Sequence, residues 1–252
     1  MSLGLAGRLA VAVLLLQSAP AKDVRPFPEP TVFFEAVRAN LARSQDDQKL
    51  FAYKERRTEL NLNPFGRLGT GGVRVTEVTP VEGGDAITIR VIERDGKPVT
   101  DSTPVRRPMR MSGRGRRIVD DVASTLDVSL NRRDHVAGRD AIVAVFKARR
   151  DAKPQTREGR IARNFAGEIW IDEQTREVFR IDAKAIDEVA FGFGGVLARL
   201  NKGATVTLRR ELVQGNLWLP VSMRFNGEGR ALLLRKLTID FAVDWFDYRR
   251  VL

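Results

Sequence analysis

The sequence has no cysteine and one histidine, and these absences exclude several kinds of site. Without thiolates the chain cannot form disulfides, zinc sites with cysteine ligands or cysteine-held iron–sulfur clusters. His135 lies between Asp134 and Val136 in a charged stretch, so we interpret it as a surface turn residue. We therefore expect neither a histidine-based triad nor a histidine-rich metal site, and we expect packing alone to hold the fold together.

The sequence also lacks a recognisable phosphate loop or catalytic pair. Segments 113–117 and 192–195 contain glycines, but neither fits G-x-G-x-x-G or G-x-x-x-x-G-K-[ST]. Two strand carboxylates such as Glu168 and Asp172 would be enough for a glycosidase, yet nothing marks out such a pair. We predict that the protein is not an enzyme and has no catalytic residue, metal or cofactor. An uncharacterised hydrolase is the remaining alternative.

Long apolar runs are absent except at the N-terminus. Arg8 precedes the apolar stretch 9–16, and the small residues Ala19 and Ala21 follow it, which is the layout of a secretory signal. The stretch is shorter than the roughly 20 residues that span a bilayer. We predict that residues 1–21 are a cleavable signal peptide and that 22–252 is one exported, periplasmic domain without a lipid anchor. An uncleaved membrane anchor is the alternative.

Basic residues are in excess, and the formal net charge is +11. Such a charge ordinarily suggests nucleic acid, but an exported protein meets anionic headgroups or acidic protein surfaces instead. We therefore predict no nucleic-acid partner. The basic segment 101–117 has few apolar residues, and we expect it to be the least ordered part of the domain. Its arginines are candidates for contact with an anionic membrane surface: Arg106, Arg107, Arg110, Arg114, Arg116 and Arg117. A solvated loop is the alternative.

Periodicity predicts two helices and many strands. Apolar residues recur at helical spacing over 31–43, after a proline-rich lead, and over 118–126. Elsewhere they alternate with polar residues, which is typical of strands that are buried on one face. The predicted strands cover 87–91, a hairpin over 168–183, 206–212, 219–225 and 237–243, with a turn at 226–229. Short turns between strands favour an antiparallel sheet in a mainly β, α+β domain.

Several short motifs carry a resemblance to a known family. F-A-G-E-I-W-I-D at 165–172, followed by V-F-R-I at 178–181, resembles a hairpin common in bacterial LolA/LolB-like lipoprotein-sorting proteins. L-F-A-Y-K-E-R at 50–56, Q-G-N-L-W-L-P at 214–220 and D-Y-R-R at 247–250 are similar to other strands of that superfamily. The resemblance implies a single curved antiparallel sheet, an incomplete barrel, whose concave face is lidded by a few helices and encloses an apolar cavity.

The resemblance also implies a function, namely a periplasmic carrier or chaperone that binds the acyl chains of lipoproteins or lipids for outer-membrane sorting. The residues expected to line its cavity are Ile169, Ile171, Ile181, Leu219, Val221, Met223, Phe225, Leu237, Ile239 and Phe241. The expected lids are Phe34, Val37 and Leu41 of the first helix, and the segment 191–200. Alternation by itself does not distinguish an open cavity from a filled core. A periplasmic sensing module that binds an envelope protein is the alternative function.

Overall fold

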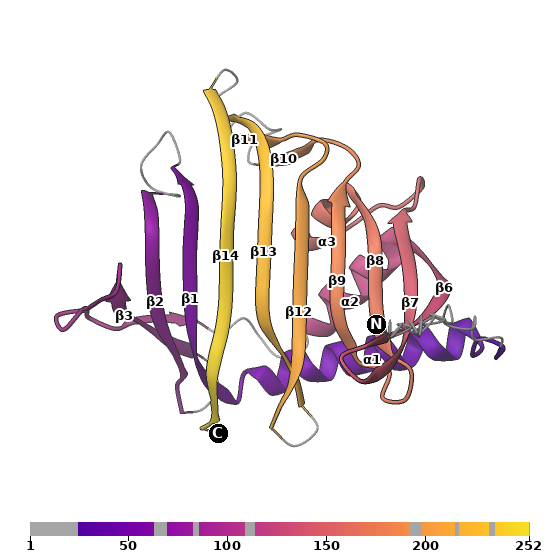
Figure 1. Ribbon diagram of the computed structural model, residues 1–252, viewed down its shortest axis with the longest axis horizontal. Helices are drawn as coiled ribbons and strands as arrows, with labels where there is room; N and C mark the ends of the chain where they lie inside the picture. Colours follow the sequence, from indigo (N-terminus) through magenta and orange to yellow (C-terminus); the bar gives the residue numbers. More distant parts are fainter. Residues whose placement is uncertain are drawn as a thin grey trace, which may run out of the picture.

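The computed structural model describes residues 25–62, 70–82, 86–108, 114–191, 198–214, 217–231 and 235–251. They form one 14-stranded antiparallel sheet, with three helices lying behind it in the view of Figure 1. The main strand order is β4-β3-β2-β1-β14-β13-β12-β9-β8-β7-β6, and β4 does not pair with β6, so the curved sheet stays open. The prediction of a mainly β fold with an incomplete barrel is confirmed. The proposed signal peptide lies outside the described residues.

The helices are α1 (Pro30–Gln48), α2 (Arg114–Thr125) and α3 (Arg157–Ala162). The strands are β1 (Phe51–Leu62), β2 (Thr70–Pro80), β3 (Ala86–Arg94), β4 (Lys97–Pro98), β5 (Val105–Pro108), β6 (Leu126–Val136), β7 (Arg139–Ala148), β8 (Phe165–Asp172), β9 (Val178–Ala185), β10 (Val189–Phe191), β11 (Ala198–Leu200), β12 (Thr205–Gln214), β13 (Leu217–Ala231) and β14 (Arg235–Arg250). In the described residues, no helix offers an apolar stretch long enough to cross a membrane.

Helix α1 runs across the strands near one end of the sheet (Figure 1). Its first turn is capped by the Glu29 carboxylate, which accepts hydrogen bonds from the backbone N–H groups of Thr31 and Val32 at 2.9 and 2.7 Å. Phe33 and Val37 are buried against apolar side chains of β7, β8 and β9. The apolar period that predicted this helix is therefore the face that packs on the sheet, and the helix extends beyond the predicted end to Gln48.

Helices α2 and α3 are held together by one carboxylate. Asp121 of α2 accepts hydrogen bonds from the backbone N–H groups of Gln155 and Thr156, both at 2.9 Å, and from the Thr156 hydroxyl. The same hydroxyl caps α3 by accepting from the Gly159 N–H at 2.9 Å. Sequence periodicity missed α3, which is only six residues long. Within the basic segment 101–117 the structure describes β5 at Val105–Pro108 and the start of α2 at Arg114, while 109–113 lie outside the described residues, so the expectation that this segment is the least ordered stays a prediction.

The pairing register places one continuous row of side chains across the sheet, because directly opposed residues in antiparallel strands point to the same face. This central row consists of Leu130, Ala144, Ile169, Ile181, Leu208, Met223, Val243, Arg57, Arg74 and Arg94. The row is apolar from β6 to β14 and changes to arginine in β1, β2 and β3. Alternation along single strands predicts the apolar part, while only the pairing shows that the arginines continue it.

The predicted turn at 226–229 is wrong, because β13 continues through it to Ala231. Strand β11 pairs with this part of β13, and a Cβ at Gly229 would lie 2.0 Å from the carbonyl oxygen of Arg199. A Cβ at Gly227 would lie 2.8 Å from both Ala204 and Leu200. These glycines therefore allow close approach of another segment, which is a second common use of glycine inside a strand.

Candidate acyl-chain cavity

A cavity of about 840 Å³ lies between the sheet and the three helices. Ligand pockets in proteins commonly enclose roughly 300–1,000 Å³ and have mostly apolar walls. The helices contribute Phe34, Val37, Leu41, Ile118, Val119, Val122, Ala123, Ile161 and Ala162. The sheet contributes Leu126, Val128, Phe146, Phe165, Ile169, Ile171, Val178, Ile181, Ala183, Leu200, Val206, Leu208, Trp218, Pro220 and Phe225. The enclosed surface is therefore suited to an apolar ligand.

Two neighbouring rows of the sheet form the floor of the cavity. The central row supplies Ile169, Ile181 and Leu208. In the adjoining row Val128 pairs with Phe146, and Ala183 pairs with Val206, which pairs with Phe225. Gly167 of β8 lies between the two groups, paired with Phe146 and Ala183. Because residues two apart in a strand share a face, the alternation seen in the sequence becomes a continuous apolar floor.

Four of the ten expected cavity residues line the cavity: Ile169, Ile171, Ile181 and Phe225. Leu219, Val221 and Met223 do not, although Met223 stands in the central row. Arg209 pairs with Ser222 and Arg210 pairs with Pro220, so Val221 forms a bulge without a partner in β12. Before the bulge Pro220 lies at the cavity, while Leu219 is fully buried in a separate cluster with Phe51 and Tyr248. Nothing in the alternation of 219–225 signals this bulge.

The remaining three expected residues lie in β14, beyond the edge of the cavity. Phe241 stacks on Phe225 with ring centroids 5.3 Å apart, and Ile239 packs against the core cluster that contains Leu200. Leu237 pairs with Gly229, and its side chain lies outside the description. Phe225 therefore marks the border of the cavity on this sheet face.

The expected lid residues Phe34, Val37 and Leu41 all line the cavity from α1. In the second expected lid, β10 and β11 form a small antiparallel pair, and Leu200 of β11 lines the cavity. Residues 192–197 lie outside the described part of the chain. Sequence reasoning missed the contribution of α2 and α3, although the apolar period over 118–126 would have supplied it through Ile118 and Val122.

The wall of the cavity contains one buried hydroxyl without a partner. Ser44 of α1 is 4% exposed, and its Oγ has no hydrogen-bond partner among the described residues. Buried polar groups are normally hydrogen-bonded, since leaving one unpaired costs about 1–3 kcal/mol. Ser44 thus offers an unused donor to a ligand, beside Gln45 and Gln48 of the same helix.

A buried ion pair contributes Arg210 to the wall of the cavity. Arg210, which lines the cavity, lies 3.5 Å from the Glu177 carboxylate and donates to the carbonyl oxygens of Val178 and Trp218, both at 2.7 Å. Burial raises the pKa of Glu177 above its ordinary value, and the guanidinium groups of Arg210 and Arg43 oppose this shift. Burial likewise lowers the pKa of Arg210. The pair therefore costs desolvation energy and is retained by its hydrogen bonds.

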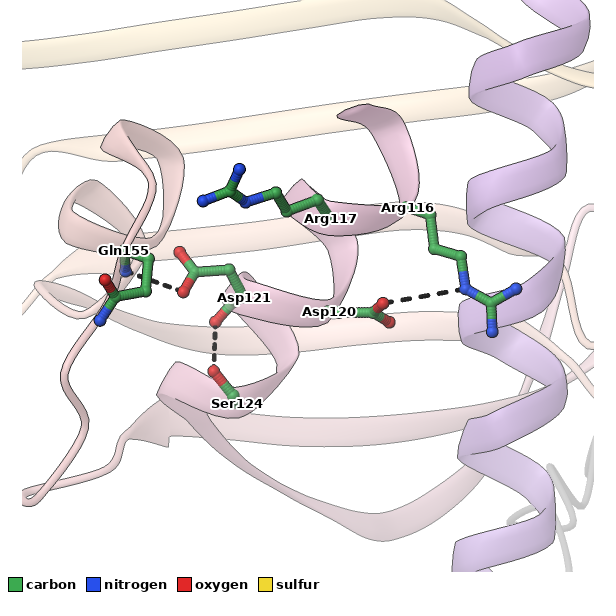
Figure 2. Close-up of a pocket in the computed structure, with 6 residues that line it drawn as sticks. All are labelled: Arg116, Arg117, Asp120, Asp121, Ser124 and Gln155. Carbon is green, nitrogen blue, oxygen red and sulfur yellow. Dashed lines mark hydrogen bonds and ion pairs between the residues drawn. The ribbon is translucent and has the colours of Figure 1, made fainter. Parts of the chain in front are cut away.

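The six candidate surface arginines do not form one cluster in the described structure. Arg106 and Arg107 are exposed in β5, whereas Arg116 and Arg117 are exposed in α2. Figure 2 shows the last two pointing away from each other, with Arg116 paired to Asp120 at 3.8 Å. Arg110 and the side chain of Arg114 lie outside the description.

The pocket drawn in Figure 2 is lined by polar residues of α2 and by Gln155. Although desolvation acts to raise it, the pKa of Asp121 is held below its ordinary value by hydrogen bonds from Gln155 and Thr156. This carboxylate is engaged in joining α2 to α3, so we assign the pocket a structural role.

Other polar candidates are engaged in the fold. Among the described residues, no group of three or more histidine, cysteine, aspartate or glutamate side chains is arranged for a metal ion. His135 is exposed at the end of β6, with Nδ1 2.9 Å from the Asp140 carboxylate. Glu168 forms an ion pair with Arg132, and Asp172 accepts hydrogen bonds from the two backbone N–H groups of the turn after β8.

No protein-family model and no curated protein matches the chain. Among solved structures, the chain is similar to a DUF1329 family protein from Desulfovibrio piger. The two share 14% identity, the alignment covers 86% of this chain and 92% of that chain, and the TM-score is 0.36. A LolA superfamily protein from Nitrosomonas europaea shares 10% identity over 86% and 93% of the chains, with a TM-score of 0.37.

A third similar structure is a domain of an outer membrane lipoprotein-sorting protein from Vibrio parahaemolyticus. It shares 10% identity over 84% of this chain and 92% of that chain, with a TM-score of 0.34. The Nitrosomonas europaea and Vibrio parahaemolyticus proteins are named after the lipoprotein-sorting superfamily that the sequence motifs of this chain resemble.

Proposed function

We propose that the protein is an exported periplasmic carrier that binds the acyl chains of lipoproteins or other lipids. The observation that supports this proposal is the apolar cavity of about 840 Å³ between the sheet and the helices. The proposal includes residues 1–21 as a signal peptide and 22–252 as the binding domain. It assigns no catalytic residue and no cofactor.

The proposed mechanism is partition of the acyl chain from water into the cavity. Each buried CH₂ group contributes about 0.8 kcal/mol, so a chain can be held without specific chemistry at its carbon atoms. The bound acyl chain is covered by three side chains of α1, namely Phe34, Val37 and Leu41. The acyl chain leaves the cavity when a competing apolar environment accepts it. Exposed arginines such as Arg106 and Arg107 attract the carrier to anionic membrane surfaces, where each contributes about 1 kcal/mol.

A paired substitution tests the cavity. Ile181→Trp adds volume at a partly buried position that lines the cavity, so we expect loss of binding of a fluorescent fatty acid with little change in the urea midpoint. Ile186→Trp is the matched control, since Ile186 is 41% exposed just after β9. This control is expected to bind the probe as the wild type does.

Two results would contradict the carrier proposal. If the wild type does not bind the fatty acid and Ile181→Trp lowers the midpoint, the space is a filled core in solution, where overpacking costs about 1–3 kcal/mol. Native mass spectrometry of the protein purified from an envelope fraction gives the second test. A co-purifying lipid or acylated protein supports transport, and a stoichiometric unmodified protein supports the sensing function instead.

A further inference from the structure

The central row continues beyond the cavity as three arginines on adjacent strands. Val243 of β14 is paired with Arg57 of β1, Arg57 with Arg74 of β2, and Arg74 with Arg94 of β3. We call these three residues the arginine row. Directly opposed side chains share a face, so the arginine row lies on the sheet face that forms the floor of the cavity.

Three like charges at opposed positions are unfavourable unless anions compensate them. Arg57 has a counter-charge in Glu59, with which it forms an ion pair. Arg74 and Arg94 are exposed, and neither has an ion-pair partner within the part of the chain that the structure describes. The nearby carboxylate of Asp95 is engaged as acceptor of the Val73 N–H at 2.7 Å. The arginine row therefore presents an excess of positive charge beyond the apolar floor of the cavity.

Aromatic side chains connect the cavity to the arginine row. Phe225 lines the cavity, and Phe241 stacks on it with nearly parallel rings. The guanidinium carbon of Arg57 lies 4.2 Å from the centroid of the Phe241 ring, which holds this arginine over the border of the cavity. Strand β1 lies two strand spacings from β13, about 10 Å, and β2 and β3, which carry Arg74 and Arg94, follow at about 14 and 19 Å. A ligand whose chain lies in the cavity can therefore place its headgroup on the arginines.

We infer that the arginine row binds the phosphate of an amphiphile whose acyl chain occupies the cavity. Guanidinium groups donate paired hydrogen bonds that match phosphate oxygens, and arginine is well suited to such contacts. This inference rests on the proposed function and narrows it, because the cargo is then a phosphate-bearing lipid. Glycerophospholipids and phosphorylated glycolipids carry the same recognised group.

The test compares two ligands with the same chain. Monopalmitoylglycerol carries no phosphate, and 1-palmitoyl lysophosphatidic acid carries a phosphate monoester. The wild type is expected to bind the phosphate form more tightly. In the double variant Arg74→Gln/Arg94→Gln this preference is expected to fall by about ten- to thirtyfold, with binding of monopalmitoylglycerol unchanged.

A charge-matched control is available in Arg209→Gln/Arg230→Gln. Both residues are exposed and lie next in sequence to cavity-face positions, so they point to the opposite face. The control is expected to keep the preference for phosphate. A preference that falls equally in both double variants would show a general effect of net charge and would overturn the inference.

The remaining outcomes separate the inference from the proposed function. Equal binding of both ligands by the wild type overturns the inference alone, and so does a preference that survives Arg74→Gln/Arg94→Gln. Failure of the wild type to bind either ligand overturns the proposed function. Comparing phosphatidylglycerol with a phosphorylated glycolipid then identifies the source of the phosphate, since the inference requires that at least one of them competes with the lysophosphatidic acid.

Discussion

Replacement of Arg210 by methionine tests the buried ion pair in the wall of the cavity. The side chain volume is largely kept, but the carbonyl oxygens of Val178 and Trp218 lose their donors. Each buried group left unpaired costs about 1–3 kcal/mol, whereas Glu177 keeps a second partner in Arg43 at 3.3 Å. We expect Arg210→Met to lower the free energy of unfolding by about 3–5 kcal/mol, the usual cost of breaking a buried pair.

The loss is expected to depend on pH. Burial already raises the pKa of Glu177, and removal of the Arg210 charge raises it further. The folded variant then binds the Glu177 proton more tightly than the unfolded chain does, so its stability falls as pH rises from the ordinary glutamate pKa through the raised one. The deficit relative to wild type should therefore be smaller at pH 5 than at pH 8.

Urea unfolding of wild type and variant at both pH values measures these differences. Arg209→Met is the matched control, because Arg209 is the exposed neighbour of Arg210 in β12, and we expect it to change stability by less than about 0.5 kcal/mol. An Arg210→Met variant as stable as the control would refute the reasoning about unpaired carbonyls. A deficit that is the same at pH 5 and pH 8 would refute the role assigned to Glu177.

Two further substitutions test how other segments are held. Gly229→Ala places a Cβ where the Arg199 carbonyl oxygen lies, so we expect β11 to separate from β13, with a loss of about 1–3 kcal/mol in urea unfolding; an unchanged midpoint would contradict this packing. Asp121→Asn weakens the contacts between α2 and α3 and should cost about 1 kcal/mol at pH 7, as loss of a helix cap does. Because the pKa of Asp121 is lowered in the folded state, its contribution is present above the ordinary aspartate pKa and is lost as pH falls through the lowered one. The loss of unfolding free energy in Asp121→Asn should therefore be smaller near pH 2 than at pH 7. A loss of the same size at both pH values would contradict the role assigned to the ionised Asp121 carboxylate.

The sequence predicts strands well where one side of each strand is apolar. The hairpin over 168–183 is found as β8 and β9, and the alternation of Ile169 and Ile171 places both side chains at the cavity. Local alternation is sufficient in these cases because the pairing between the strands preserves the face of each residue.

The errors arise where contacts between distant segments decide the structure. The bulge at Val221 separates Leu219 from the cavity, and it is defined by the register with β12. The glycines at 227 and 229 resemble a turn, but they accommodate β11 and the segment after it. Cavity and filled core have the same period of two, so the open space itself could be expected only from the family resemblance.

The cover of the cavity consists of two parts, α1 and the pair α2 and α3, and each of them is anchored to the sheet. The α1 side is held at both ends: Arg133 donates to the carbonyl oxygens of Arg25 and Pro26 just before the helix, and only two residues join its last turn to β1. Midway, Asn40 donates to the Thr175 carbonyl oxygen at 2.8 Å. Helix α1 is therefore held to the sheet along its length. The pair α2 and α3 is joined internally through Asp121, α2 continues directly into β6, and only two residues join α3 to β8. This side of the cover is therefore anchored to the sheet as well, and the cavity is expected to keep its shape when an acyl chain enters or leaves.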